Sequence, residues 1–202
     1  MKSNVFFLAL SLCILIFGAS CSVDNQNEVS AADTPDASTT TIPDAPLSLV
    51  ERGGYLVLTS GCADCHSPKK MTEMGPVVDM DRYMMGFPAD QPRPEFKQSD
   101  IPQGWILMNM DQTAAVGPWG VSYAANLTPD ESGIGNWSYE NFKRALVEGK
   151  YRGQETGRTL MPPMPWQNIG QMKDEDMQAM FAYLQSLKPI ENVVPAYTPP
   201  VQ

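Results

Sequence analysis

The sequence predicts an all-α domain that one long loop interrupts. Helical spacing of apolar residues marks three segments, residues 48–58, 138–149 and 174–188. The stretch between the first two, residues 71–125, is rich in Pro, Gly, Met and aromatic residues and has no sustained periodicity. No segment repeats another. We therefore expect a single domain in which the three helices form the core and residues 71–125 form a long, ordered loop insertion.

The first helix is predicted to run from about Ser48, whose side chain can cap it, to Leu58. A glycine inside a helix costs about 1 kcal/mol relative to alanine, yet Gly53 and Gly54 stand side by side here. Paired glycines let another backbone approach closely, so we expect a packing contact at this point. The apolar face of this helix is expected to consist of Val50, Tyr55 and Leu58.

The second and third helices have clear beginnings and ends. Ser138 can act as the N-cap of the second helix, which stops at Gly149. The third helix starts near Asp174 and ends before Pro189, because the residue before a proline disfavours helix. We expect both helices to bury one stripe of side chains, which is Phe142, Ala145 and Leu146 in the second and Met177, Met180, Phe181, Leu184 and Leu187 in the third.

Composition narrows the range of functions. The chain has 202 residues, of which 43% are hydrophobic, and a formal net charge of -9. This acidic balance disfavours a phosphate-binding surface, so we expect no nucleic-acid partner. His66 is the only histidine, and the sequence contains neither a Ser/His/Asp arrangement with a second histidine nor a phosphate-binding loop. Hydrolytic functions therefore have little support.

The N-terminus has the parts of a secretory signal. Lys2 precedes an apolar run at residues 5–17, which is shorter than the roughly 20 residues that a membrane-spanning helix needs. Small residues then lead to Cys21. We expect residues 1–21 to be a signal peptide and the protein to be exported, in the periplasm. Cys21 is either acylated, as in bacterial lipoproteins, which would tether the protein to the membrane, or lies at the border of a plain cleavage site.

Two segments of low complexity flank the predicted domain. Residues 22–46 contain no aromatic residue and no positive charge, and such a segment cannot bury enough apolar surface to fold. We expect it to be a disordered linker. The domain is expected over residues 47–190, and residues 191–202 are expected to form a proline-rich tail.

The segment Cys62-Ala63-Asp64-Cys65-His66 is the attachment pattern of a c-type haem. The two thiols can bond the two vinyl groups, and the adjacent imidazole can bind the iron. We therefore predict one covalent haem c, held by Cys62 and Cys65, with His66 as an iron ligand. The alternatives are a disulfide between the two cysteines and half of a zinc site. Zinc takes four ligands, whereas this domain offers three cysteine or histidine side chains.

The sixth iron ligand must differ from the fifth, because the chain has a single histidine. Methionine is the natural choice, and residues 160–166, Leu-Met-Pro-Pro-Met-Pro-Trp, contain two. Prolines on both sides of Met164 exclude a helix and stiffen the loop, so we predict Met164 as the ligand. Met161 is its rival, and an open sixth position is a further alternative. A thioether ligand raises the reduction potential, as suits an electron carrier.

Together these features resemble the class I c-type cytochrome family, in which an N-terminal helix, a Cys-x-x-Cys-His motif, a distant Met-Pro loop and a closing helix follow one another. The similarity is greatest to bacterial cytochrome modules that accompany periplasmic dehydrogenases and oxidases. Segments like 126–130, Asn-Leu-Thr-Pro-Asp, 133–137, Gly-Ile-Gly-Asn-Trp, and 162–166, Pro-Pro-Met-Pro-Trp, recur in them. The resemblance assigns haem attachment to Cys62 and Cys65, the proximal ligand to His66 and the distal ligand to Met164.

The resemblance also implies that the first and third helices cross near the haem edge, with Gly53 or Gly54 letting the backbones meet. The predicted function is single-electron transfer, either by a free or tethered carrier or by a cytochrome subunit of an oxidoreductase, without enzymatic activity of its own. Redox proteins would be its donor and acceptor. The alternatives are a small-ligand sensor or peroxidase-like enzyme with an open sixth position, and a structural lipoprotein with a disulfide. The insertion would cover the haem or form a docking face, while Trp105 and Trp119 pack in the core.

Overall fold

The computed structural model describes residues 47–93, 97, 99 and 101–200. The predicted signal peptide and linker, residues 1–46, lie outside these described residues. Among the helices that the structure describes, none combines the length and the apolar composition needed to span a membrane.

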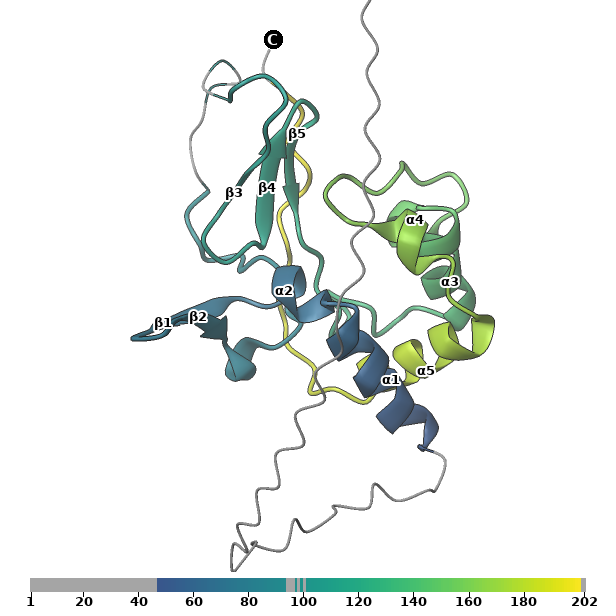
Figure 1. Cartoon of the computed structure of the whole chain (residues 1–202). Helices are drawn as coiled ribbons and strands as arrows, with labels where there is room; N and C mark the ends of the chain where they lie inside the picture. The colour runs from purple at the N-terminus through teal and green to yellow at the C-terminus, as the bar shows by residue number, and fades with distance from the viewer. Residues whose placement is uncertain (1–46, 94–96, 98, 100, 201–202) are drawn as a thin grey trace, which may run out of the picture. The chain divides into compact units, whose positions relative to one another are not determined.

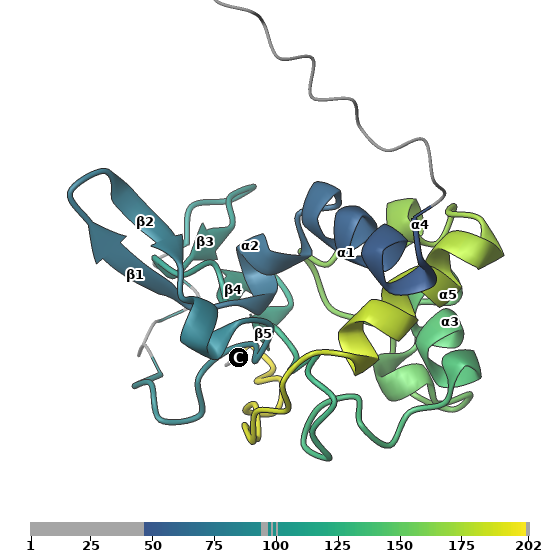
Figure 2. The same cartoon turned by 90° about the horizontal axis from the view of Figure 1, so that it is seen from below.

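Helices form the part of the domain that contains the core. α1 spans Leu49–Thr59, α3 spans Tyr139–Val147 and α5 spans Asp174–Gln185, which confirms the three predicted helices. Two shorter helices, α2 at Cys62–His66 and α4 at Trp166–Ile169, join them. Figures 1 and 2 show α1, α3, α4 and α5 packed as one group, with α2 between this group and the strands.

Serine residues begin α1 and α3, as predicted. The Ser48 hydroxyl accepts a hydrogen bond from the backbone N–H of Glu51, at 3.3 Å, and the Glu51 carboxylate accepts one from the backbone N–H of Ser48, at 2.9 Å. Ser138 and Asn141 form the same reciprocal pair at the start of α3. Each pair satisfies two of the backbone N–H groups that a helix leaves free at its N-terminus.

The buried stripes predicted for the second and third helices are confirmed, whereas the face predicted for the first is wrong. Val50, Tyr55 and Leu58 are exposed, and α1 instead buries Gly53 and Val57. These two residues are four apart and therefore lie on the same side of a helix. In α3 and α5 the buried side chains are Phe142, Ala145, Leu146, Met177, Met180 and Leu184, with Phe181 and Leu187 packed against them.

The face of α1 is set by its crossing with α5. A Cβ atom added at Gly53 would lie 1.9 Å from the carbonyl oxygen of Ala179, so the two backbones are in contact. Beside the crossing, the Nε atom of Arg52 donates a hydrogen bond to the Asp176 carboxylate at 2.7 Å. The close approach implied by the family resemblance is therefore present, and Gly53 makes it possible.

We expect the Gly53→Ala substitution to destabilise the domain, because its methyl group would displace a backbone carbonyl. Overpacking of this kind costs typically 1–3 kcal/mol, or more where the backbone must move, and exceeds the roughly 1 kcal/mol that alanine gains in a helix. For a domain of this size we expect the melting temperature of the haem-loaded protein to fall by roughly 5–10 °C.

Gly54→Ala is the matched control, because a Cβ atom there would lie 3.0 Å from the edge of the Tyr183 ring, a side chain that can move. Its melting temperature is expected to stay within about 3 °C of the wild type. Equal melting temperatures for the two variants, measured by calorimetry, would contradict the assignment of the crossing to Gly53.

The insertion contains two small antiparallel sheets where the sequence predicted only ordered loop. The first is a hairpin of β1, Lys69–Thr72, and β2, Gly75–Val78. The second has the strand order β3-β4-β5. Its members are β3 at Leu107–Met108, β4 at Ala114–Gly117 and β5 at Gly120–Tyr123.

The strands are short and irregularly buried, which explains why periodicity did not reveal them. All four residues of β4 are buried, so the strand shows no alternation of buried and exposed side chains. β1 and β2 consist mostly of exposed residues and likewise lack a buried face. Two single-turn 3₁₀ helices, Met80–Arg82 and Tyr151–Gly153, complete the described secondary structure. The predicted helical domain is confirmed, with small sheets added to it.

The proline-rich C-terminal segment runs along the insertion. Val121 of β5 exchanges two backbone hydrogen bonds with Thr198, at 2.8 and 3.0 Å. Asn192 is buried, accepts a hydrogen bond from the N–H of Ala89 and donates to the carbonyl oxygens of Met85 and Phe87. We call residues 189–200 the C-terminal strap. In Figures 1 and 2 it passes from the end of α5 to the sheet of β3, β4 and β5.

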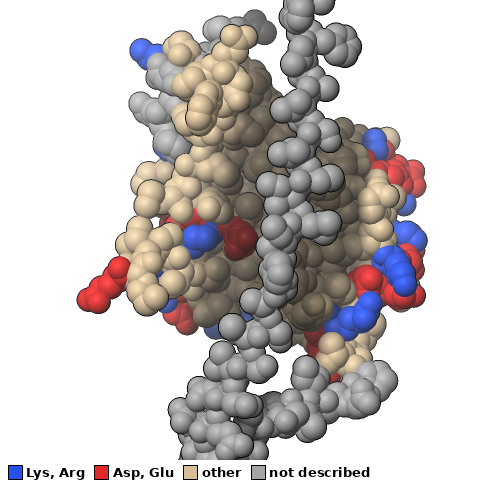
Figure 3. All heavy atoms as spheres, in the orientation of Figure 1, with Lys and Arg blue, Asp and Glu red and all other residues tan. Residues whose placement is uncertain are grey.

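Charge is unevenly distributed over the visible surface. In Figure 3, Lys, Arg, Asp and Glu side chains gather over α3 and α5, whereas most of the visible surface over β3, β4 and β5 is uncharged. Trp105, which the sequence predicted in the core, is 67% exposed just before β3. Trp119 is partly buried and packs its ring against Gly117, so the prediction of core packing was wrong for Trp105 alone.

Candidate haem site

The Cys-x-x-Cys-His segment forms α2, a single short helix directly after α1. Gly61 precedes it with a φ of 68°, a conformation that glycine adopts without steric cost, and so lets the chain turn out of α1. One turn of helix places Cys62 and Cys65 on neighbouring positions of one face, because residues three apart are adjacent on a helix surface. His66 follows at the end of this turn and is buried.

The two cysteines are free thiols in partly buried positions. Burial raises the pKa of the Cys62 thiol to about 11, and burial also raises the pKa of Cys65. Both side chains are therefore neutral near pH 7. The structure places no disulfide, which was one alternative, between them. Within the described residues, no cluster of three or more His, Cys, Asp and Glu side chains could hold a metal ion, so the zinc alternative finds no further ligands.

The imidazole of His66 is held by a backbone carbonyl. Its Nδ1 atom lies 2.8 Å from the carbonyl oxygen of Ala125, and since that partner can only accept, Nδ1 carries the proton. Burial lowers the pKa of His66, which keeps the ring neutral. The Nε2 atom then retains its lone pair, as a metal-binding imidazole requires.

The methionine loop, residues 160–166, closes against the helical core from the side of α4. Met164 packs against the buried hydrophobic cluster that includes Phe142 and Ile169, whereas Met161 is not part of that packing. A cavity of about 430 Å³ opens along the loop and is lined by residues 159, 160 and 162–167. The ring of Trp166 covers Gly149 so closely that a Cβ atom added at Gly149 would lie 2.5 Å from it.

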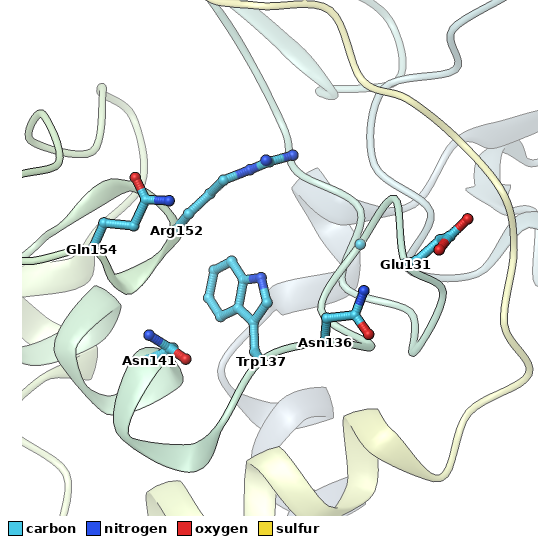
Figure 4. Close-up of a pocket in the computed structure, with 7 residues that line it drawn as sticks. Glu131, Asn136, Trp137, Asn141, Arg152 and Gln154 are labelled. Atoms are coloured by element: carbon cyan, nitrogen blue, oxygen red, sulfur yellow. The ribbon is translucent and has the colours of Figure 1, made fainter.

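A second, polar cavity of about 280 Å³ contains a cationic side chain and an indole (Figure 4). Arg152 has a φ of 57°, a conformation that is costly for any residue but glycine and that concentrates at functional sites. In Figure 4 its side chain extends past the ring of Trp137. Among the described residues, the Arg152 guanidinium lies over the Tyr151 ring, 5.8 Å from its centroid, and forms no ion pair, while the Trp137 indole N–H forms no hydrogen bond.

The turn that carries Arg152 is fixed to α3. A Cβ atom added at Gly153 would lie 1.9 Å from the carbonyl oxygen of Asn141, so only glycine fits there. Arg144 donates a hydrogen bond to the Gly153 carbonyl at 2.8 Å. Arg152 could not be predicted as a site residue, because an arginine before a glycine in a loop is too common a sequence pattern to indicate a site.

The chain belongs to the cytochrome c family, which matches residues 50–188. It is 31% identical over 137 residues to the gluconate 2-dehydrogenase cytochrome c subunit of Pantoea cypripedii, covering 67% of this chain and 22% of that protein. It is 29% identical over 149 residues to the cytochrome c subunit of the quinone alcohol dehydrogenase of Gluconobacter oxydans, covering 73% of this chain and 23% of that protein.

A shorter stretch of 80 residues is 45% identical to a nicotinate dehydrogenase subunit of Pseudomonas putida, covering 39% of this chain and 6% of that protein. The chain thus spans less than a quarter of the length of these relatives. The predicted family, covalent haem c and electron-carrier class are confirmed.

The described residues fit a covalently attached haem. Two free thiols lie one helical turn apart, a neutral imidazole keeps one nitrogen available, and a polar cavity is lined by Arg152, the Trp137 indole and Glu131. A haem presents vinyl groups, an iron and two carboxylates, which are the partners that these groups would take.

Proposed function

We propose that this protein is the cytochrome subunit of an oxidoreductase and carries single electrons through one haem c bound by Cys62 and Cys65, with His66 and Met164 as iron ligands. The observation that carries the proposal is the hydrogen bond between Nδ1 of His66 and the carbonyl of Ala125. It fixes the tautomer and the orientation of the imidazole directly after the two free thiols.

Met164 is a better candidate than Met161 for the sixth position. It packs against the core cluster, which limits the motion of its side chain, whereas Met161 is outside that packing. Its neighbours Pro163 and Pro165 restrict the backbone on either side. When bound, the haem supplies a one-electron ferric/ferrous couple, and a thioether ligand favours the ferrous state.

We further propose that Arg152 and Trp137 bind haem carboxylates. The guanidinium supplies a fixed positive charge, and the indole N–H can only donate a hydrogen bond, so each suits an anionic oxygen. The strained backbone at Arg152, held by the packing of Gly153 on α3, supports a role beyond folding.

Removing the charge with Arg152→Gln is expected to lower the reduction potential. A positive charge disfavours the oxidised, more positive haem, and a charge about 10 Å away at an effective dielectric constant of about 20 contributes roughly 1–2 kcal/mol before screening. We expect a decrease of roughly 20–60 mV, measured by spectroelectrochemistry at low ionic strength. Lys173→Gln, which removes an exposed cation at the start of α5, serves as the control. An equal decrease in both variants would argue against carboxylate binding by Arg152.

The electron donor is proposed to be a dehydrogenase. The relatives in Pantoea and Gluconobacter are, by name, the cytochrome c subunits of gluconate 2-dehydrogenase and alcohol dehydrogenase. Export by residues 1–21 and a lipid tether on Cys21, followed by the linker of residues 22–46, would hold such a subunit at the outer face of a membrane. The domain boundaries at residues 47 and 190 are part of the same proposal.

The test is a redox titration of the full-length protein, produced in a host that attaches c-type haem. We expect a covalently bound, low-spin haem that titrates as a single one-electron couple, and a ferrous form that binds carbon monoxide slowly or not at all. A high-spin resting iron that binds carbon monoxide readily would contradict the carrier function. That result would favour a sensor or peroxidase-like protein with an open sixth position.

A further inference from the structure

Ser122 connects the insertion to the methionine loop. It lies on β5, is 8% exposed and pairs with Ala115 of β4. Its Oγ atom lies 2.5 Å from the carbonyl oxygen of Pro162 and 3.3 Å from that of Ala115. A hydroxyl has one proton to donate, and the shorter contact takes it, so Ser122 donates to Pro162.

The hydroxyl of Ser122 is itself oriented from both sides. The indole N–H of Trp119 donates to its oxygen at 3.3 Å, which leaves the proton directed away from the tryptophan. Val121, the preceding residue, is fixed by its two backbone hydrogen bonds to Thr198 of the C-terminal strap. β5, which carries Ser122, is therefore paired with β4 along one edge. At Val121, the residue before Ser122, it is also bonded to the C-terminal strap.

Few other hydrogen bonds fix the methionine loop. Pro162, Pro163 and Pro165 have no backbone N–H, so the loop can be fixed by hydrogen bonds mainly through its carbonyl groups. Among the described residues, the bond from Ser122 is the only hydrogen bond formed by any residue between 161 and 164. The next ones along the chain are those of Leu160 with Gly149 and of Pro165 with α4.

We propose that Ser122 is a positioning residue for the axial methionine: by holding the Pro162 carbonyl, it keeps the loop closed with Met164 directed at the iron. This inference rests on the proposed ligation by Met164 and assigns the insertion a role in it. The sheet of β3, β4 and β5 would thus hold the methionine loop in place, in addition to any part it has in partner binding.

The Ser122→Ala substitution removes this hydrogen bond and leaves the Pro162 carbonyl without its donor. The net contribution of a hydrogen bond of this kind corresponds to a roughly five- to tenfold change in an equilibrium constant. Imidazole binds ferric haem only when the methionine sulfur leaves. We therefore expect imidazole to replace the sulfur in Ser122→Ala at a five- to tenfold lower concentration than in the wild type.

The readout is the sulfur-to-ferric charge-transfer band of the haem-loaded, full-length protein during an imidazole titration. Ser122→Thr keeps a hydroxyl at the same position and is expected to restore the midpoint to within about twofold of the wild type. Trp119→Phe removes the N–H that orients the hydroxyl, together with part of the ring that packs on Gly117, and is expected to shift the midpoint in the same direction by about twofold. It provides the measurement if Ser122→Ala does not fold.

Ser132→Ala is the matched control, since its hydroxyl donates to Asp130, accepts from the Asn126 side chain and the Asn192 backbone, and has no hydrogen bond with the methionine loop. Its midpoint should equal that of the wild type. An unchanged midpoint in Ser122→Ala and Trp119→Phe, or an equal shift in Ser132→Ala, would overturn the role of Ser122 while the band itself still supports Met164. Absence of the band from the wild type would instead reject the proposed ligation and this inference with it.

Discussion

Replacing both Cys62 and Cys65 with serine is expected to abolish covalent haem binding. Each thioether bond requires a cysteine sulfur, and serine cannot substitute for it under the same conditions. The double variant should show no haem stain after denaturing electrophoresis, whereas the wild type should stain at the size of the chain. Each single variant keeps one thiol and should retain a reduced amount of bound haem, whose reduced spectrum is shifted because one vinyl group remains unreacted.

Cys21→Ser is the control for this experiment, because it removes a cysteine from the predicted lipid-attachment position and leaves the haem motif intact. Its haem content per polypeptide should equal that of the wild type, while its fraction in the membrane pellet should fall. Haem that survives denaturation of the double variant would contradict the assignment of Cys62 and Cys65.

Met164→Ala is expected to have the second largest effect. Loss of the sulfur should remove the sulfur-to-ferric charge-transfer band, allow carbon monoxide to bind the ferrous iron and lower the reduction potential. Axial ligands set haem potentials over a range of about 0.8 V, and we expect a decrease on the order of 100 mV. Spectroelectrochemistry measures the band and the potential in one titration.

Met161→Ala is the matched control, because it removes a methionine from the same loop at a position that does not pack against the core cluster. It should keep the band and a potential near that of the wild type. If the band disappears in Met161→Ala and persists in Met164→Ala, the two methionines must be exchanged in the assignment.

Helices could be predicted from this sequence because their signals are local. Ser48 and Ser138 cap the helices that they were expected to cap, and the stripe beginning at Met177 is buried as predicted. The apolar face of α1 was not predictable in this way. It depends on Gly53 meeting Ala179, a residue far away in the chain, and a glycine contributes nothing to an apolar pattern.

The candidate site likewise has a local part, which the sequence reveals, and a part that only the fold brings together. Cys62, Cys65 and His66 form a contiguous motif, so the sequence alone identified them. Ser122 acts through Pro162, 40 residues further on, and nothing in either segment indicates this pairing before the chain folds. Arg152 likewise gains its significance only from the cavity that it lines.

The C-terminal strap affects the order in which the parts of the domain fold. Its contacts join Asn192 to Ala89, 103 residues away, and Thr198 to Val121. Contacts of such long range form late, because closing a large loop costs entropy before it brings stabilisation. Until the C-terminal strap has been synthesised, β5 lacks its bridge to Thr198 and is held by β4 alone.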